Sequence, residues 1–415
     1  MADKKRNHDS GKVRQIELDP NRARRIREHH KDSILKQERR RRQRRRKRNR
    51  LLIILLVLAV IIGIGYLIWQ KQRTYHSLTV KSSLMQEDQA SAGYRLFDGR
   101  LLKIGSDGVT FMSIEGDVIW KESYSIQNPM VDVNGQYAVI AGKDDTQVLL
   151  YNLKGKATEI KTTLPVSKVR VSDTGMLAVI MADEQVSWIR VYNEQGEMVA
   201  ESKSTLTGSG YPVDVAISAD GLKLMVAYHS IAKQALRSQV AFYQFGSAGK
   251  TEVDNLVSGT EYREHVVPEV RFLNNAQALA LRDDGFSTFE GSQIPVQKAN
   301  IEVENEIEAI CYDDSRVVVL TGTKAENGKQ YQAVVYDMAG REKKRFAVNG
   351  RYTSCQLIDG KLVMVRENTL TVMTLDGKVR FSGDYSSPIR SIFAGKGAYS
   401  YVIIGENTID HVKLK

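Results

Sequence analysis

An internal repeat constrains the fold of this 415-residue chain more than any other feature of its sequence. The segment LFDGRLLKIGSDGVTFMSIEGDVIWKESY, which begins at Leu96, aligns without a gap with LIDGKLVMVRENTLTVMTLDGKVRFSGDY, which begins at Leu357. Nine of the 29 aligned positions are identical, and seven others exchange one apolar residue for another. Asp-Gly between alternating apolar residues favours a β-hairpin, because glycine accepts a positive φ without strain. The repeat therefore predicts an all-β fold built from one four-stranded unit.

The turn of the first hairpin recurs at intervals along the chain. Its eight instances, some without the glycine, are Asp98-Gly99, Asn134-Gly135, Asp173–Gly175, Asp220-Gly221, Asn274-Asn275, Asp313-Asp314, Asp359-Gly360 and Gly395–Gly397. Their spacing of about 36 to 54 residues is that of four-stranded propeller blades. We therefore expect an eight-bladed β-propeller over residues 93–415, or a seven-bladed one if the weak fifth unit merges with a neighbour. A β-sandwich would not explain the repeat, and the ends of a solenoid are atypical caps rather than close copies.

The last of these units offers only three strands. A strand-like segment at residues 76–84, HSLTVKSSL, precedes the first complete unit and is expected to supply the missing outer strand. Pairing between the two segments would close the ring and remove the exposed sheet edges that promote aggregation.

An uncharged apolar run, Leu51–Trp69, lies upstream of the repeat. As a helix its 19 residues would be about 28 Å long, close to the hydrocarbon thickness of a bilayer. We expect a single transmembrane helix at residues 51–69, bounded by Arg50 and Leu51 at one end and by Tyr66 and Trp69 at the other. A cleaved signal peptide fits poorly, because 50 residues precede the run and a signal peptide's apolar region spans only about 7 to 15.

The charges that flank the apolar run predict its orientation. Residues 36–50 contain 11 Lys and Arg, whereas residues 70–84 contain three. Positively charged flanks stay in the cytoplasm, so residues 1–50 are expected inside the cell. The linker at residues 70–92 and the domain at residues 93–415 are then expected on the extracytoplasmic side of the cell membrane.

The net charge of +11 comes entirely from the N-terminal tail. Residues 1–50 contain 21 Lys and Arg against 7 Asp and Glu, a net charge of +14, which leaves −3 for the other 365 residues. We expect this tail to be partly disordered or helical and to contact anionic lipid headgroups of the bilayer. Nucleic acid is the alternative partner, but the Arg-rich run has no interleaved aromatic residues for base stacking and no recognition fold.

No catalytic, cofactor-binding or metal-binding residue is predicted. Residues 70–415 contain four histidines: His76, His229, His265 and His411. None of them has a second ligand at metal spacing, and no nucleophile elbow, phosphate-binding loop or cysteine cluster is present. Asp283–Gly291, DDGFSTFEG, lacks the ligand spacing of an EF-hand loop and is interpreted as a turn between strands. Cys311 and Cys355 could form a disulfide, but their spacing leaves the question open.

Three long insertions give the only positional indication of a binding site. With strands A to D counted from the centre of a propeller outward, B–C turns and D–A connections lie on one face. Residues 229–238 and 323–330, between strands B and C, and residues 246–265, between blades four and five, would all emerge there. Loops on a rigid scaffold often bind partners, although tolerated insertions are an equal alternative. The candidate partner-binding residues are His229, Arg237, Tyr262, Arg263, His265 and Lys324.

One blade carries a quinoprotein-type motif, a glycine followed by tryptophan, in GDVIW at Gly116–Trp120, and GKVRF at Gly377–Phe381 is a weaker copy. The chain resembles, over residues 35–415, a family of single-pass membrane proteins of Gram-positive bacteria. That family has a basic cytoplasmic N-terminus and an extracytoplasmic WD40- or quinoprotein-like propeller, catalogued as a domain of unknown function. Because the other blades lack the motif, the resemblance implies neither a cofactor nor an activity.

These observations favour a membrane-anchored scaffold or sensor that binds an extracytoplasmic protein or an envelope polymer, without a cofactor. The alternative is a cell-envelope hydrolase or quinone-dependent oxidoreductase with its site at the propeller channel. Such an enzyme would leave no local motif, because propeller sites are assembled from several blades. Converging carboxylates or a metal in the channel would favour the enzyme, and a mixed polar lining would favour the binder.

Overall fold

The computed structural model describes residues 53–63, 65, 73–85, 93–183, 186–232, 235–325 and 328–415. The chain divides into two compact units, residues 1–73 and 74–415, which we treat separately. In the first unit, residues 53–63 are helical. Within the described ranges, no helix combines the length and the apolar character that a membrane crossing requires. The tail at residues 1–50 and the predicted boundary residues Arg50, Leu51, Tyr66 and Trp69 lie outside the described residues.

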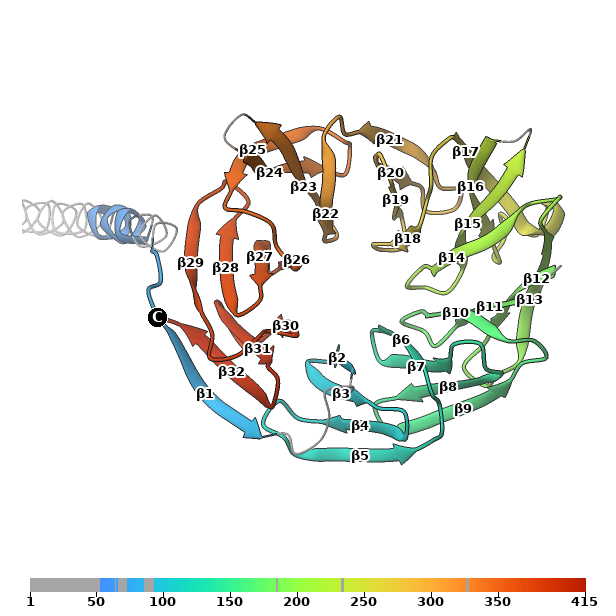
Figure 1. Cartoon of the computed structure of the whole chain (residues 1–415), viewed down its shortest axis with the longest axis horizontal. Coiled ribbons are helices and arrows are strands. Elements are labelled where there is room, and N and C mark those ends of the chain that lie inside the picture. The colour runs from blue at the N-terminus through green and yellow to red at the C-terminus, as the bar shows by residue number, and fades with distance from the viewer. Residues whose placement is uncertain are drawn as a thin grey trace, which may run out of the picture. The chain divides into compact units, whose positions relative to one another are not determined.

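The second unit is an eight-bladed β-propeller (Figure 1). Its 32 described strands form eight four-stranded sheets around a central axis, and the first strand of each complete repeat is innermost. The all-β, eight-bladed prediction is therefore confirmed, and the weak fifth unit is a blade of its own. Each of the eight predicted turns lies between strands A and B of a blade.

The strands of each blade are given from strand A outward. Blade one contains β2 (Gly93–Phe97), β3 (Arg100–Ile104), β4 (Gly108–Met112) and β5 (Val118–Ser123). Blade two contains β6 (Pro129–Asn134), β7 (Tyr137–Gly142), β8 (Gln147–Asn152) and β9 (Gly155–Lys161). Blade three contains β10 (Val166–Val171), β11 (Leu177–Ala182), β12 (Val186–Tyr192) and β13 (Met198–Thr205). Blade four contains β14 (Tyr211–Ile217), β15 (Lys223–Ala232), β16 (Ala235–Gln244) and β17 (Leu256–Arg263).

The remaining blades follow in chain order. Blade five contains β18 (Glu269–Phe272), β19 (Gln277–Arg282), β20 (Gly285–Glu290) and β21 (Val296–Glu302). Blade six contains β22 (Glu306–Tyr312), β23 (Arg316–Ala325), β24 (Gly328–Asp337) and β25 (Glu342–Val348). Blade seven contains β26 (Ser354–Ile358), β27 (Lys361–Arg366), β28 (Thr369–Thr374) and β29 (Val379–Asp384). Blade eight contains β30 (Ser391–Ala394), β31 (Ser400–Ile404), β32 (Thr408–Leu414) and β1 (Leu78–Met85).

Blade eight joins the two ends of the propeller. Strand β1 pairs antiparallel with β32, from Leu78 opposite Leu414 to Met85 opposite Thr408. The outer strand of the last blade therefore comes from the segment that precedes the first blade, as the eight-bladed fold requires. In this arrangement β32 has a partner on both sides and presents no open edge.

The apolar core is divided between the blades. Eight clusters of buried side chains occur among the described residues, and each joins two neighbouring blades. Strands B and C are covered on both faces, so that β7 and β11 read as nearly continuous apolar runs. Outer strands such as β13 have one solvated face and are more polar. The ring therefore depends on contacts between sheets as much as on pairing within them.

Cys311 in β22 and Cys355 in β26 form a disulfide, a question that the sequence left open. The bond joins the innermost strands of blades six and seven. The Cα atoms of the two cysteines lie 6.1 Å apart. It therefore adds a covalent link to one of the interfaces between blades.

The structure corrects the prediction for residues 246–265. They were expected to form one connection between blades four and five. Instead, β17 is the outer strand of blade four, and the 3₁₀ helix η1 (Val253–Asn255) precedes it in the C–D connection. Residues 246–255 therefore belong to the face opposite the B–C turns, and only residues 264–268 connect blade four to blade five.

Candidate functional site

Two β-hairpins extend from one face of the propeller, which we call the B–C/D–A face because those connections form it. The blade-four hairpin, β15–β16, is paired out to Ala232 opposite Ala235. The blade-six hairpin, β23–β24, is paired out to Ala325 opposite Gly328. In blade four, β14 accompanies the hairpin only as far as His229 and β17 only as far as Arg237. The described residues between these two positions therefore extend beyond the neighbouring strands.

Two of the predicted partner-binding residues, Tyr262 and His229, contact neighbouring parts of the propeller itself. Tyr262 in β17 is only 6% exposed and packs in the apolar cluster between blades four and five. The Nε2 atom of His229 lies 3.1 Å from the carbonyl oxygen of Val267. Burial lowers the pKa of His229, which favours the neutral imidazole.

The other predicted residues occupy different positions on this face. Arg237 and Arg263 both contact Glu261, with N–O distances of 2.6 and 3.3 Å, and the side chain of Arg263 is 86% exposed. His265 lies in the connection that follows β17. Lys324 is in β23, two blades away, and its side chain lies outside the described part of the structure. The structure thus brings five of the six predicted residues together in and beside blade four.

The blade-four hairpin also carries an exposed apolar pair that the sequence analysis did not identify. Ile231 and Leu236 lie opposite each other near its end and are 76% and 36% exposed. Leu206, in the connection that leads into blade four, is 65% exposed. The alternation of side chains along a strand places Ile231 and Leu236 on one face of the hairpin and Arg237 on the other. The hairpin therefore presents an apolar face and a basic face.

The innermost strands contain a network of charged side chains around the fully buried Asp214 of β14. Its Oδ1 atom lies 3.0 Å from Arg170 Nη2 and 3.2 Å from Lys168 Nζ, both from β10. Its Oδ2 atom accepts a 2.9 Å hydrogen bond from the Val270 N–H and lies 3.6 Å from Arg271 Nη1, both from β18. One carboxylate therefore joins the inner strands of three consecutive blades.

Two further carboxylates of the inner strands are also paired. Asp132 lies 3.9 Å from Arg170; burial raises the pKa of Asp132 and the guanidinium partly offsets this effect. Glu269 accepts a 2.9 Å hydrogen bond from the Tyr312 hydroxyl and lies 3.2 Å from Arg271 Nε. These carboxylates neutralise neighbouring cations rather than converge on an open position. The network therefore resembles the mixed polar lining expected of a binder.

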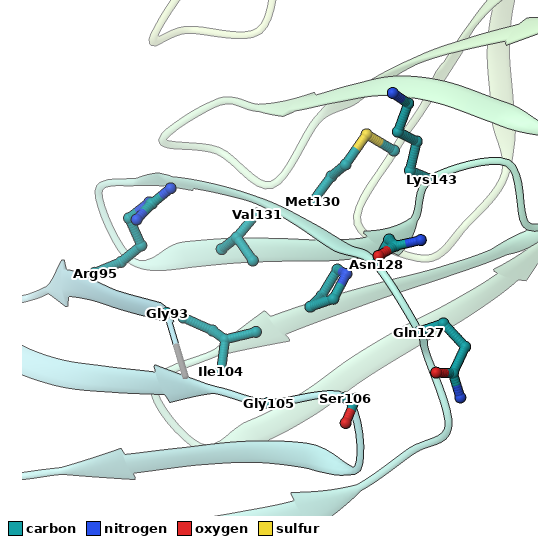
Figure 2. Close-up of a pocket in the computed structure, with 11 residues that line it drawn as sticks. Gly93, Arg95, Ile104, Gly105, Ser106, Gln127, Asn128, Met130, Val131 and Lys143 are labelled. Carbon is teal, nitrogen blue, oxygen red and sulfur yellow. The ribbon is translucent and has the colours of Figure 1, made fainter. Parts of the chain in front are cut away.

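A cavity of about 590 Å³ lies between blades one and two on the B–C/D–A face (Figure 2). Figure 2 shows Arg95 and Lys143 on opposite sides of it, with Met130 between them. The other described lining residues are Gly93, Ile104, Gly105, Ser106, Gln127, Asn128, Pro129 and Val131. None of these described residues is Asp, Glu, His or Cys. The cavity can therefore hold a small polar group, and Lys143 is the one described lining residue of a type that acts in acid–base catalysis.

The likeness to a solved structure with a TM-score of 0.50 shows the fold alone. The crystal structure of BamB from Moraxella catarrhalis is 11% identical, with a TM-score of 0.50, and the match covers 81% of this chain and all of that one. The Pan2 WD40 domain of Neurospora crassa is 7% identical, with a TM-score of 0.45, and the match covers 81% of this chain and 94% of that one. No curated protein matches the sequence. A family model matches residues 71–414, and the chain therefore belongs to this family of unknown function, DUF5711.

Proposed function

We propose that this protein is a membrane-anchored scaffold that binds an extracytoplasmic protein through the blade-four hairpin. The observation that carries the proposal is the exposed apolar pair, Ile231 and Leu236, on a hairpin that extends beyond its blade. The basic face with Arg237 and Arg263 adjoins it. An apolar centre with arginines nearby is the composition typical of protein interfaces.

Two other features support parts of this proposal. The inner-strand carboxylates are paired with cations, which disfavours an envelope hydrolase with its acid and base in the channel. The apolar run at residues 51–69 and its basic flank support anchoring with the propeller outside. An envelope polymer is the second candidate ligand, and the cavity beside Arg95 and Lys143 is the feature that favours it.

The test is chemical crosslinking in intact cells that express the full-length chain. We expect the double variant I231S/L236S to reduce the yield of crosslinked partner at least tenfold, because truncating an interface hot-spot residue costs more than about 1 kcal/mol and a tenfold change in affinity is about 1.4 kcal/mol. Deleting residues 246–265 is a poorer test, because it would remove strand β17.

The matched control is V253S/L256S, which removes two exposed apolar side chains on the opposite face of the same blade, Val253 in the C–D connection and Leu256 at the start of β17. This variant should keep the crosslinked partner. Equal yields from I231S/L236S and the unmodified chain, at unchanged expression, would contradict the proposal. If only a polysaccharide or teichoic-acid-like polymer is recovered, the second candidate ligand replaces the first.

A further inference from the structure

Three side chains that can ligate a metal meet beside the blade-four hairpin. His265 lies in the connection between β17 and β18, and Asp283 and Asp284 form the B–C turn of blade five. The Nδ1 atom of His265 is 3.6 Å from Asp283 Oδ1 and 3.5 Å from Asp284 Oδ2. All three potential ligand atoms lie within 4.8 Å of one another.

The two separations from His265 match those between neighbouring ligands of a tetrahedral metal ion. Metal bonds of about 2.0–2.2 Å to nitrogen and oxygen, at tetrahedral angles, place neighbouring ligand atoms about 3.3–3.6 Å apart. The two measured separations from His265 fall in this range. One imidazole and two carboxylates suit zinc and similar transition metals, whereas calcium takes six to eight oxygen ligands.

Backbone contacts hold the two loops in register. The Val266 N–H donates a 3.1 Å hydrogen bond to Asp283 Oδ1, and the Asp283 N–H donates one of the same length to the Val266 carbonyl. The Ser238 hydroxyl donates a 2.6 Å hydrogen bond to the His265 carbonyl. Glu264, directly before His265, has a φ of 66° in the left-handed region. The approach of His265 to the aspartates is therefore supported from both neighbouring blades.

A buried arginine orients the third ligand. Arg282 is 4% exposed; its Nη2 donates a 3.1 Å hydrogen bond to Asp284 Oδ2, and its Nε lies 2.9 Å from Asp284 Oδ1. A carboxylate oxygen has a second lone pair, and metal-bound carboxylates commonly accept such hydrogen bonds from the surrounding protein. Arg282 thus fixes the direction of Asp284 and also limits the net negative charge of the cluster.

We propose that His265, Asp283 and Asp284 bind one divalent transition-metal ion of the zinc type, with water in a fourth position. The bound ion links the D–A connection of blade four to the B–C turn of blade five. This site is independent of the docking proposal, although the two are adjacent: the Glu264 N–H donates a 3.0 Å hydrogen bond to the Leu236 carbonyl of the hairpin. The competing interpretation is that His265 pairs with the two aspartates and that no metal ion binds.

The test is metal binding to the full-length chain, purified without a histidine tag and stripped with a chelator. Co²⁺ is titrated while the visible absorption is recorded, because the absorption bands of tetrahedral and octahedral Co²⁺ differ in intensity. Zn²⁺ is then used to displace it, and the stoichiometry is measured by calorimetry. The variants are H265A and the conservative D283N, and H76A, which removes an exposed histidine at the edge of blade eight, is the control.

We expect one equivalent of Zn²⁺ and a tetrahedral Co²⁺ spectrum for the unmodified chain and for H76A. H265A and D283N should each weaken binding at least 100-fold, because loss of an outer-shell contact alone typically costs 10- to 100-fold. Circular dichroism checks that both variants remain folded. Equal binding by H265A and the unmodified chain, or no binding at micromolar metal concentrations, would overturn the proposal in favour of the ion pair.

Discussion

At the scale of single residues, Asp214 is the side chain on which the inner strands depend most. It is fully buried and contacts Lys168, Arg170 and Arg271 from two other blades. Asparagine in its place preserves the shape of the side chain but leaves the partly buried Arg170 without its closest carboxylate. We therefore expect D214N to lower the free energy of unfolding by about 3 kcal/mol, as when one member of a buried ion pair is removed. Urea denaturation followed by circular dichroism measures the change.

The control for this variant is D98N, at an exposed ion pair with Arg100 in the first hairpin turn. Asparagine tolerates the positive φ of 48° at this position, so a loss below about 1 kcal/mol is expected. Equal losses from the two variants would contradict the role given to Asp214.

The sequence could not reveal this network, because Arg170 and Asp214 are 44 residues apart and meet only through the packing of blades. The approach of His265 to Asp283 and Asp284 was missed for the same reason.

At the scale of elements, β1 determines whether the ring is closed. Without β1, β32 would expose its backbone hydrogen-bonding groups as a free edge, and its buried Ile409 and Val412 would lose cover. We expect a chain comprising residues 86–415 to form soluble oligomers or aggregates, because unpaired strand edges template association. A chain comprising residues 74–415 retains β1 and should remain monomeric. Size-exclusion chromatography with light scattering distinguishes the two, and a monomeric 86–415 of equal thermal stability would refute the expectation.

The sequence predicted elements where their turns repeat and failed where a turn departs from the repeat. Asp98-Gly99 and Asp359-Gly360 are typical hairpin turns, and the blades that contain them were identified directly. In blade four, an insertion after Gln244 lengthens the C–D connection, so the outer strand β17 was mistaken for part of an interblade loop. The error concerns the face on which residues 246–255 lie. It does not affect Arg237 and Arg263, which lie at the other end of their strands.

At the scale of the whole molecule, the disulfide bears on where the propeller is located. Disulfides persist mainly in oxidising compartments, and Cys311–Cys355 joins two blades. Closing a loop of 44 residues is expected to contribute about 3–4 kcal/mol to stability in the chain-entropy description. The bond therefore supports the proposed extracytoplasmic location, as does the contrast between the +14 tail and the −3 remainder.

This location can be tested with single added cysteines and a membrane-impermeant maleimide on intact cells. We expect S209C, in an exposed connection between blades three and four, to be labelled without lysis, because the proposed orientation places the propeller outside the cell. S10C, in the basic tail, should be labelled only after lysis, because positively charged flanks remain in the cytoplasm. The unmodified chain is the control and should react only after reduction, since both native cysteines are paired. Labelling of S10C in intact cells, or of S209C only after lysis, would reverse the proposed orientation and would leave the blade-four hairpin facing cytoplasmic partners.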